Sequence, residues 1–165
     1  MKLLIAYDGS TDAKAAVILA GHLFDSSTAV VLTVWEGFSE VLDRASAGLA
    51  STFDFEQINA ECEQRAHECA IDGAGHARAA GLQAEARVSE RRESIADTIL
   101  QEAAANGAEL VVVGTRGLSG VRSLLLGSVS RAVFQHARLP VLVAPSPGPG
   151  AEHLAINEPF LSARL

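Results

Sequence analysis

The sequence is poor in the residues that mark several large classes of protein. Cysteine occurs only as Cys62 and Cys69, without a CxxC pair or neighbouring histidines at zinc-ligand spacing. On one helix the two would stand about 10 Å apart, beyond the roughly 7 Å that a disulfide spans. We therefore expect neither a disulfide nor a zinc site, and we interpret both cysteines as small buried apolar residues.

Long apolar runs and an excess of positive charge are also missing. No apolar stretch approaches the roughly 18 residues of a membrane span, and the one at Leu3–Ala6 is too short for the core of a secretory signal. The formal net charge is −7, whereas nucleic acids and anionic membranes require a basic surface. We expect a cytoplasmic protein that binds neither nucleic acid nor membrane.

What the sequence does contain is enough apolar material for one core, since 48% of its 165 residues are hydrophobic. Residues 1–146 are expected to form one domain, and the proline- and glycine-rich residues that follow predict a linker and tail over 147–165. Residues 36–54 show no period and predict a long connection.

Strand-like and helix-like segments alternate along the domain. The pattern predicts an α/β fold, an open, doubly wound parallel sheet of five strands with helices on both faces. The expected strands are 2–7, 29–35, 82–88, 110–113 and 139–144, and the expected helices are 11–24, 55–80, 95–105 and 129–136.

Local signals refine these helices. Ser10 and Ser94 are expected as N-caps, Ser94 forming a capping box with Asp97. Leu23 continues the apolar stripe of the first helix. Gly73 and Gly75 predict a bend or an early end in the second. Glycines 81 and 107 are expected to end helices.

The most informative stretch lies between the fourth strand and the last helix. Gly114-Thr115-Arg116-Gly117 is followed by nine residues and then by Gly127-Ser128. Glycine allows a positive φ or a close approach of backbone to ligand, and a helix start presents N–H groups to an anion. A plain strand-to-helix turn is the alternative. The lysine of GxxxxGK[ST] and the spacing of GxGxxG are absent.

The Gly-x-x-Gly-x9-Gly-Ser spacing resembles the signature of the universal stress protein family, in its ATP-binding branch. The resemblance extends to residues 1–10 and 136–143, and it spans roughly residues 1–146. It implies a Rossmann-like sheet of the adenine nucleotide alpha hydrolase type, with strand order 3-2-1-4-5. That order sets Asp8 beside Gly114, at the switch point where such sheets bind ligands.

The resemblance also implies roles for individual residues. Asp8 would face the adenosine part of ATP and Val34 would contact adenine, with Mg²⁺ or Mn²⁺ accompanying the phosphates. Simple helix capping is the alternative role for Asp8 and for Ser128. The ribose and phosphates would be held by the loop and the following helix, through Gly114, Gly117, Gly127, Ser128, Val129 and Ser130.

Other polar residues carry less information. A guanidinium suits phosphate, but at least two of Arg116, Arg122 and Arg131 are expected at the surface. The five histidines are scattered and no catalytic role is assigned to them. Residues 89–94 replace a Gly-x-Pro or Gly-Asp turn that is usual in the family, which leaves the ribose-side rim of the site undefined.

By resemblance, the function is that of a nucleotide-responsive regulatory protein of the stress response, with at most slow ATP hydrolysis. The alternatives are a nucleotide-free interaction module, or an ATP pyrophosphatase or adenylyl transferase of the same superfamily. The Ser-Gly-Gly-x-Asp-Ser and His-x-Gly-His signatures of those enzymes are absent. The fifth strand is expected at a sheet edge, and the resemblance implies a homodimer through Val141 and Val143.

Overall fold

The structure, a computed structural model, describes residues 1–37, 55–115 and 126–146. The expectations for Gly117, Arg116 and Arg122, for most of the connection at 36–54 and for the tail at 147–165 therefore fall outside the described residues. The rest of the domain can be compared with its sequence element by element.

Five strands form one sheet in the order β3-β2-β1-β4-β5, and all four neighbouring pairs are parallel. This confirms the predicted fold class and the implied strand order. The last strand begins at Val141 rather than Leu139, because Pro140 has no N–H to donate to the ladder. The strands are β1 (Lys2–Ala6), β2 (Thr28–Trp35), β3 (Gln83–Glu90), β4 (Leu110–Gly114) and β5 (Val141–Ala144).

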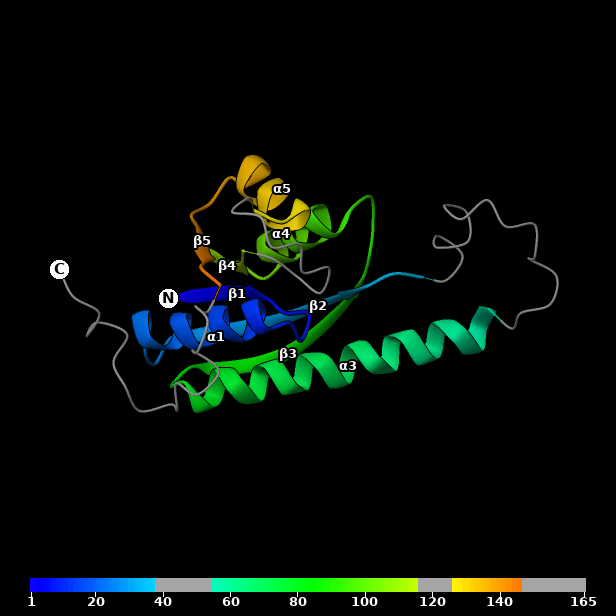
Figure 1. Ribbon diagram of the computed structural model, residues 1–165, viewed down its shortest axis with the longest axis horizontal. Helices are drawn as coiled ribbons and strands as arrows, with labels where there is room; N and C mark the ends of the chain where they lie inside the picture. The colour runs from blue at the N-terminus through cyan, green and yellow to red at the C-terminus, as the bar shows by residue number, and fades with distance from the viewer. Residues whose placement is uncertain (38–54, 116–125, 147–165) are drawn as a thin grey trace.

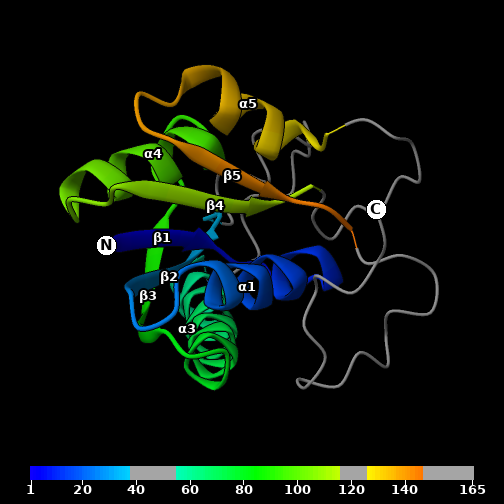
Figure 2. The same cartoon turned by 90° about the vertical axis from the view of Figure 1, so that its left-hand side faces the viewer.

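Four helices of the described chain cover the two faces of this sheet. Figures 1 and 2 show α1 and α3 on one face and α4 and α5 on the other. The connections between strands are therefore the crossovers that a parallel sheet requires. The helices are α1 (Thr11–Leu23), α3 (Phe55–Ala79), α4 (Ile95–Ala105) and α5 (Ser128–His136).

The central strands are buried on both faces, which explains their unbroken apolar sequence. In β1, Leu3 and Ile5 pack in the cluster under α1 and α3, while Leu4 packs in the cluster under α4 and α5. All five residues of β4 are buried. The alternating sequence of the edge strand β3 predicts one buried face, but Ala84 and Val88 are only half-buried and Ala86 is exposed.

The predicted helix signals are largely confirmed. The Oγ of Ser10 accepts from Ala13 N at 3.1 Å, and the Oγ of Ser94 accepts from Asp97 N at 3.0 Å. Gly81 and Gly107 have φ of 96° and 63°, the left-handed conformation that ends a helix.

Two predictions about the helices are wrong. Leu23 is 55% exposed, because at 3.6 residues per turn it lies about 80° away from the centre of the stripe that begins at Ala13, whereas Phe24 continues that stripe. The helix α3 runs unbroken through Gly73 and Gly75. The tertiary packing of α3 against the sheet outweighs the low helix propensity of glycine.

The two glycines of α3 stand in opposite environments. A Cβ added at Gly73 would come within 2.6 Å of the Tyr7 ring and 2.8 Å of Val31, whereas one added at Gly75 would meet nothing within 4 Å. Gly73 is therefore the point at which the helix backbone approaches the sheet.

This contrast predicts opposite effects of one substitution. Gly73→Ala should destabilise the protein by about 1–3 kcal/mol, the usual cost of overpacking. Gly75→Ala should stabilise it by about 0.5–1 kcal/mol, because alanine loses less backbone entropy in an exposed helix. Urea denaturation measures both; equal effects of the two variants would contradict the packing described here.

Candidate functional site

The candidate site lies at the carboxyl edge of the sheet, where β1 and β4 are neighbours. Asp8 follows β1 and Gly114 ends β4, and the two strands pair from Leu3↔Leu110 to Ile5↔Val112. Figure 2 shows the carboxyl ends of β4 and β5 on the same side of the molecule as the first turns of α1 and α5. The strand order thus brings together the segments that the sequence singled out.

Asp8 belongs to a turn that precedes α1. Its Oδ1 accepts from the N–H of Ser10 at 3.0 Å, and Gly9 between them has φ of 79°. Ser10, rather than Asp8, is the N-cap of α1. The helix-capping alternative for Asp8 therefore does not hold, and its carboxylate lies part-buried at the sheet edge.

Val34 lies near the end of β2. The bonds of its neighbours show that its N–H and C=O point toward the β1 side of that strand. Tyr7 N donates to Leu32 O at 2.8 Å on that side, and Arg91 N donates to Trp35 O at 2.7 Å on the other. Alternate residues of a parallel strand face alternate neighbours, so Val34 shares the orientation of Leu32. Because β1 has ended at Ala6, the peptide edge of Val34 faces the candidate site.

The first turn of α5 presents backbone donors to the same edge. Gly127 is the N-cap of α5, and no side chain there accepts from the first N–H groups of the helix. The first hydrogen bond of the helix runs from Arg131 N to Gly127 O at 3.0 Å. The N–H groups of Ser128, Val129 and Ser130 precede that bond and have no acceptor within the helix. Ser128 is exposed and does not cap the helix, contrary to the capping alternative.

The side chain of Ser130 has a structural role. Its Oγ donates to Gly114 O at 2.6 Å and contacts Thr115 O at 3.3 Å, while Gly127 N donates to Thr115 O at 2.8 Å. The two ends of the glycine loop are therefore joined to each other. Only the backbone N–H of Ser130 remains for a ligand.

Gly114 is required by the packing of α1 against the end of β4. A Cβ at this position would meet the backbone C and O of Asp12 at 2.8 Å. The first turn of α1 thus rests directly on the last residue of β4, and no other residue fits there without moving one of the two.

A hydrogen-bonded group that the sequence did not predict connects the same segments. The Oδ2 of Asp12 accepts from Thr115 Oγ1 at 2.8 Å and from Ser146 Oγ at 2.6 Å, and the two hydroxyl oxygens are 2.9 Å apart. The three residues come from α1, from the start of the glycine loop and from the exit of β5. Their sequence separations are too large for any local motif.

The helix α3 closes the Asp8 side of the site. The Tyr7 hydroxyl donates to Asp72 Oδ2 at 2.6 Å, and the Thr33 hydroxyl donates to Tyr7 O at 2.8 Å. Burial, with the neighbouring Asp72, raises the pKa of Tyr7 far above its ordinary value. Burial also raises the pKa of the Cys69 thiol, with Asp8 and Asp72 adding to the effect. Cys69 therefore stays a neutral thiol.

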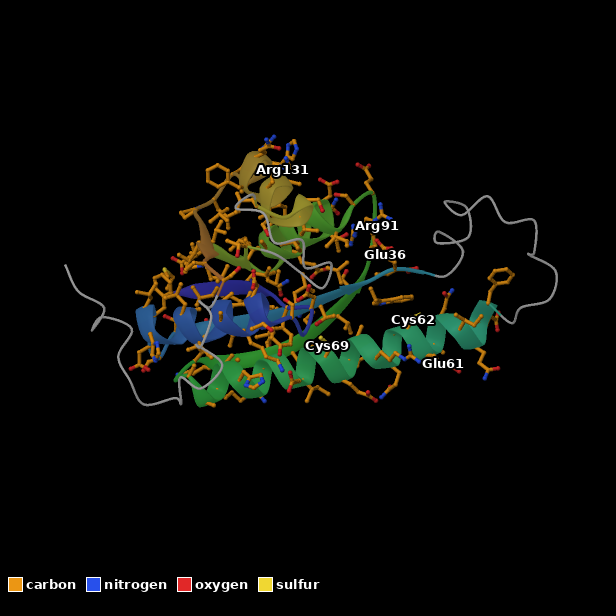
Figure 3. The ribbon with its side chains drawn as sticks, viewed as in Figure 1. Glu36, Glu61, Cys62, Cys69, Arg91 and Arg131 are labelled. Carbon is orange, nitrogen blue, oxygen red and sulfur yellow. The ribbon has the colours of Figure 1, made fainter. Side chains whose placement is uncertain are left out.

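Both cysteines lie along α3 (Figure 3) and are free, but they are only partly buried. The expectation that they are buried is met only in part: Cys69 packs against the cluster under α1 and α3, and neither side chain is completely covered. The buried residues of α3 all lie between Ala66 and Ala77, so the part of the helix that carries Cys62 is not covered by the sheet.

An ion pair lies at the ends of β2 and β3, in the segment where the sequence departs from the family pattern. Arg91 Nη1 lies 3.4 Å from Glu36 Oε1, and Arg91 Nη2 donates to Glu93 O at 3.0 Å. Figure 3 shows Arg91 and Glu36 next to each other, beyond the end of the sheet. This pair stands where the family's usual turn is missing.

The other polar residues that the structure describes do not form a second centre. Arg131 and His136 are exposed on α5, and His67 and His76 lie within 3.9 Å and 3.6 Å of acidic residues one turn earlier on α3. In the described part of the chain, no group of His, Cys, Asp or Glu is arranged to hold a metal ion. Over the same ranges, no helix is both long and apolar enough to cross a bilayer.

A cavity of about 470 Å³ lies at the opposite end of the sheet. Its lining includes neither a glycine loop nor a helix N-terminus, so it does not offer an anion the backbone donors found at the candidate site. Its walls come from the amino ends of β1, β2 and β3 and from the end of α3, and they include Lys2, Thr28, Arg78, Gln83 and Glu85.

Comparison with known proteins extends the resemblance seen in the sequence. Residues 1–145 match the model of the universal stress protein family. Universal stress protein YxiE of Bacillus subtilis is 31% identical over 145 residues, covering 86% of this chain and 97% of the relative. A universal stress protein of Thermus aquaticus is 35% identical over 145 residues, covering 86% and 96%.

Solved structures share the fold at lower identity. An Arabidopsis thaliana universal stress family protein with AMP bound has a TM-score of 0.61 at 18% identity, covering 92% of this chain and 98% of its own. One from Archaeoglobus fulgidus in complex with dAMP has 0.57 at 20%, covering 87% and 96%. A universal stress protein in complex with cAMP has 0.62 at 24%, covering 88% and 97%.

Proposed function

Because this chain belongs to the universal stress protein family, we propose that it binds ATP at the carboxyl edge between β1 and β4. The protein is then a cytoplasmic, nucleotide-responsive homodimer of the stress response. Three structurally similar proteins are described as complexes with AMP, dAMP or cAMP, which supports an adenine nucleotide as the class of ligand.

The observation that carries the proposal is the convergence of three kinds of group at one edge. A carboxylate from Asp8 suits ribose hydroxyls, the peptide edge of Val34 suits a purine base, and the first-turn N–H groups of α5 suit phosphate. No single element supplies all three, and only the strand order brings them together.

The choice of a triphosphate rests on the Gly-x-x-Gly-x9-Gly-Ser spacing, which includes Gly117. With a net charge of −7, the protein does not attract the phosphates by its overall field. Mg²⁺ or Mn²⁺ would supply that charge and would be held mainly by the phosphates, since the described residues offer no cluster of ligands for it. Turnover is proposed to be slow at most, with ATP acting as a conformational ligand.

The identity of the nucleotide is tested by mass spectrometry of what the purified protein releases on denaturation. We expect ATP or its hydrolysis product ADP, together with saturable binding of ATP and Mg²⁺ by isothermal titration calorimetry. The proposal fails if no adenine nucleotide is released and the titration shows no binding. Release of AMP alone would keep the site but refute the triphosphate.

Asp8→Ala should make the free energy of ATP binding less favourable by about 1–3 kcal/mol, the scale for losing a hydrogen bond to a charged group. The binding of a triphosphate that carries no base or sugar should be weakened far less, because the carboxylate is proposed to face the sugar. Asp8→Asn is the matched control, since its amide oxygen still accepts from Ser10 N and preserves the turn. Calorimetry with both ligands decides; equal losses would mean that Asp8 acts on metal or phosphate.

A further inference from the structure

Thr115 is a junction at which the glycine loop is joined to three other elements. Its N–H donates to Ala144 O of β5 at 3.0 Å, and its carbonyl accepts from Gly127 N at the start of α5 at 2.8 Å. Its hydroxyl donates to Asp12 Oδ2 of α1 at 2.8 Å. A single residue thus fixes where the loop leaves the sheet and where it returns to α5.

Asp12 is the residue that accepts the hydrogen bond from the Thr115 hydroxyl. Its Oδ2 takes a second hydrogen bond from Ser146 at 2.6 Å, and its backbone lies against Gly114. A carboxylate accepting two hydroxyl donors makes stronger bonds than a neutral acceptor would. The contact at Gly114 is independent of these bonds and places Asp12 against the root of the same loop.

We propose that Asp12 and Thr115 are positioning residues of the nucleotide site: the Asp12 carboxylate orients Thr115, and the Thr115 carbonyl holds Gly127, and with it the first turn of α5, at the end of β4. Neither side chain is assigned to touch the ligand. The inference rests on the proposed function, because it concerns the first turn of α5, whose N–H groups would hold the phosphates. Affinity for phosphate-bearing ligands therefore depends on Asp12 more than affinity for a nucleoside does.

The test compares Thr115→Val, which keeps the shape and removes the hydroxyl, with Thr115→Ser, which keeps the hydroxyl. We expect Thr115→Val to weaken the binding of ATP and AMP by up to about tenfold. Without the bond to Asp12, part of the binding free energy is spent on restoring the position of Thr115, and that cost is limited by the worth of one charge-assisted hydrogen bond. The affinity of Thr115→Val for adenosine should fall by less than about threefold. Thr115→Ser should retain most of the wild-type affinity for ATP. Calorimetry supplies the affinities and urea denaturation the stabilities.

Two further variants separate positioning from simple loss of stability. Asp12→Ala should lower the affinity for ATP as Thr115→Val does. The double variant should lose no more affinity than the single variant with the larger loss, because both substitutions remove the same bond. Thr28→Val is the control for the substitution itself, since the Thr28 hydroxyl donates to Met1 O at the opposite end of the sheet. It should lower stability slightly and leave ATP affinity unchanged.

The outcomes are distinguishable. If the wild-type protein binds ATP, two results refute the positioning role while the nucleotide site stands. One is that Thr115→Val binds ATP as tightly as the wild type, and the other is that it loses as much affinity for adenosine as for ATP. Additive losses in the double variant would also refute it. If the wild-type protein binds no adenine nucleotide, the proposed function fails and this inference fails with it.

Discussion

Gly114→Ala is expected to cost the protein most of its affinity for ATP, at least about tenfold, which corresponds to about 1.4 kcal/mol. The added Cβ would lie 2.8 Å from the backbone of Asp12, which cannot rotate away as a side chain can. Either the first turn of α1 moves, carrying the Asp8 turn, or the end of β4 moves, carrying Thr115. Both displacements separate the two halves of the site.

The same variant should be destabilised by about 1–3 kcal/mol, the range for overpacking. Gly75→Ala makes the identical change where nothing lies within 4 Å, so it controls for the substitution and should bind ATP normally. Calorimetry and urea denaturation on both variants separate binding from folding. A Gly114→Ala protein that binds ATP like the wild type would show that the contact between β4 and α1 does not define the site.

Val143→Pro is expected to convert the proposed homodimer into a monomer. Pro140 O accepts from Val111 N and Ala144 O accepts from Thr115 N, both on the β4 side of β5. The backbone groups of the alternate residues Val141 and Val143 therefore point away from the sheet. An outward edge of this kind is free to pair with the same edge of a second copy across a two-fold axis, which is the contact proposed for the homodimer. Proline at 143 removes one outward N–H and leaves the β4–β5 bonds intact.

The double variant Val141→Glu with Val143→Glu should also give a monomer, because two copies would place four carboxylates at the contact. Both valines pack partly against the cluster under α4 and α5, so these substitutions also lower stability. Leu142→Ala is the control, since Leu142 packs against the cluster under α1 and α3. It should remain a dimer by multi-angle light scattering. A folded dimer of Val143→Pro would place the interface elsewhere.

Sequence patterns predicted the parts of this fold that depend on neighbours in the chain. Ser10 and Ser94 cap helices through residues three positions away, and Gly81 and Gly107 take the left-handed conformation that their positions require. The strand order came from the family resemblance, because parallel strands carry no local signal of which neighbour they choose. Leu23 was misplaced, since a stripe of apolar residues does not define its own centre.

The contacts that the sequence could not predict join distant segments. The bonds from Asp12 to Thr115 and Ser146 span 103 and 134 positions, and the one from Tyr7 to Asp72 spans 65. Hydroxyl and carboxyl residues of this kind are common on any surface, so only the folded chain distinguishes them. The same holds for the pair of Arg91 and Glu36 at the rim.

The position of the nucleotide is tested most directly by following backbone amides in ¹H–¹⁵N spectra during a titration with ATP and Mg²⁺. We predict shifts at Val34, at Ser128 to Ser130 and in the Asp8 turn, with little change at Gln83 and Glu85 beside the opposite cavity. Shifts confined to the residues of that cavity would contradict the assignment of the site to the carboxyl edge. So would a spectrum that ATP does not change.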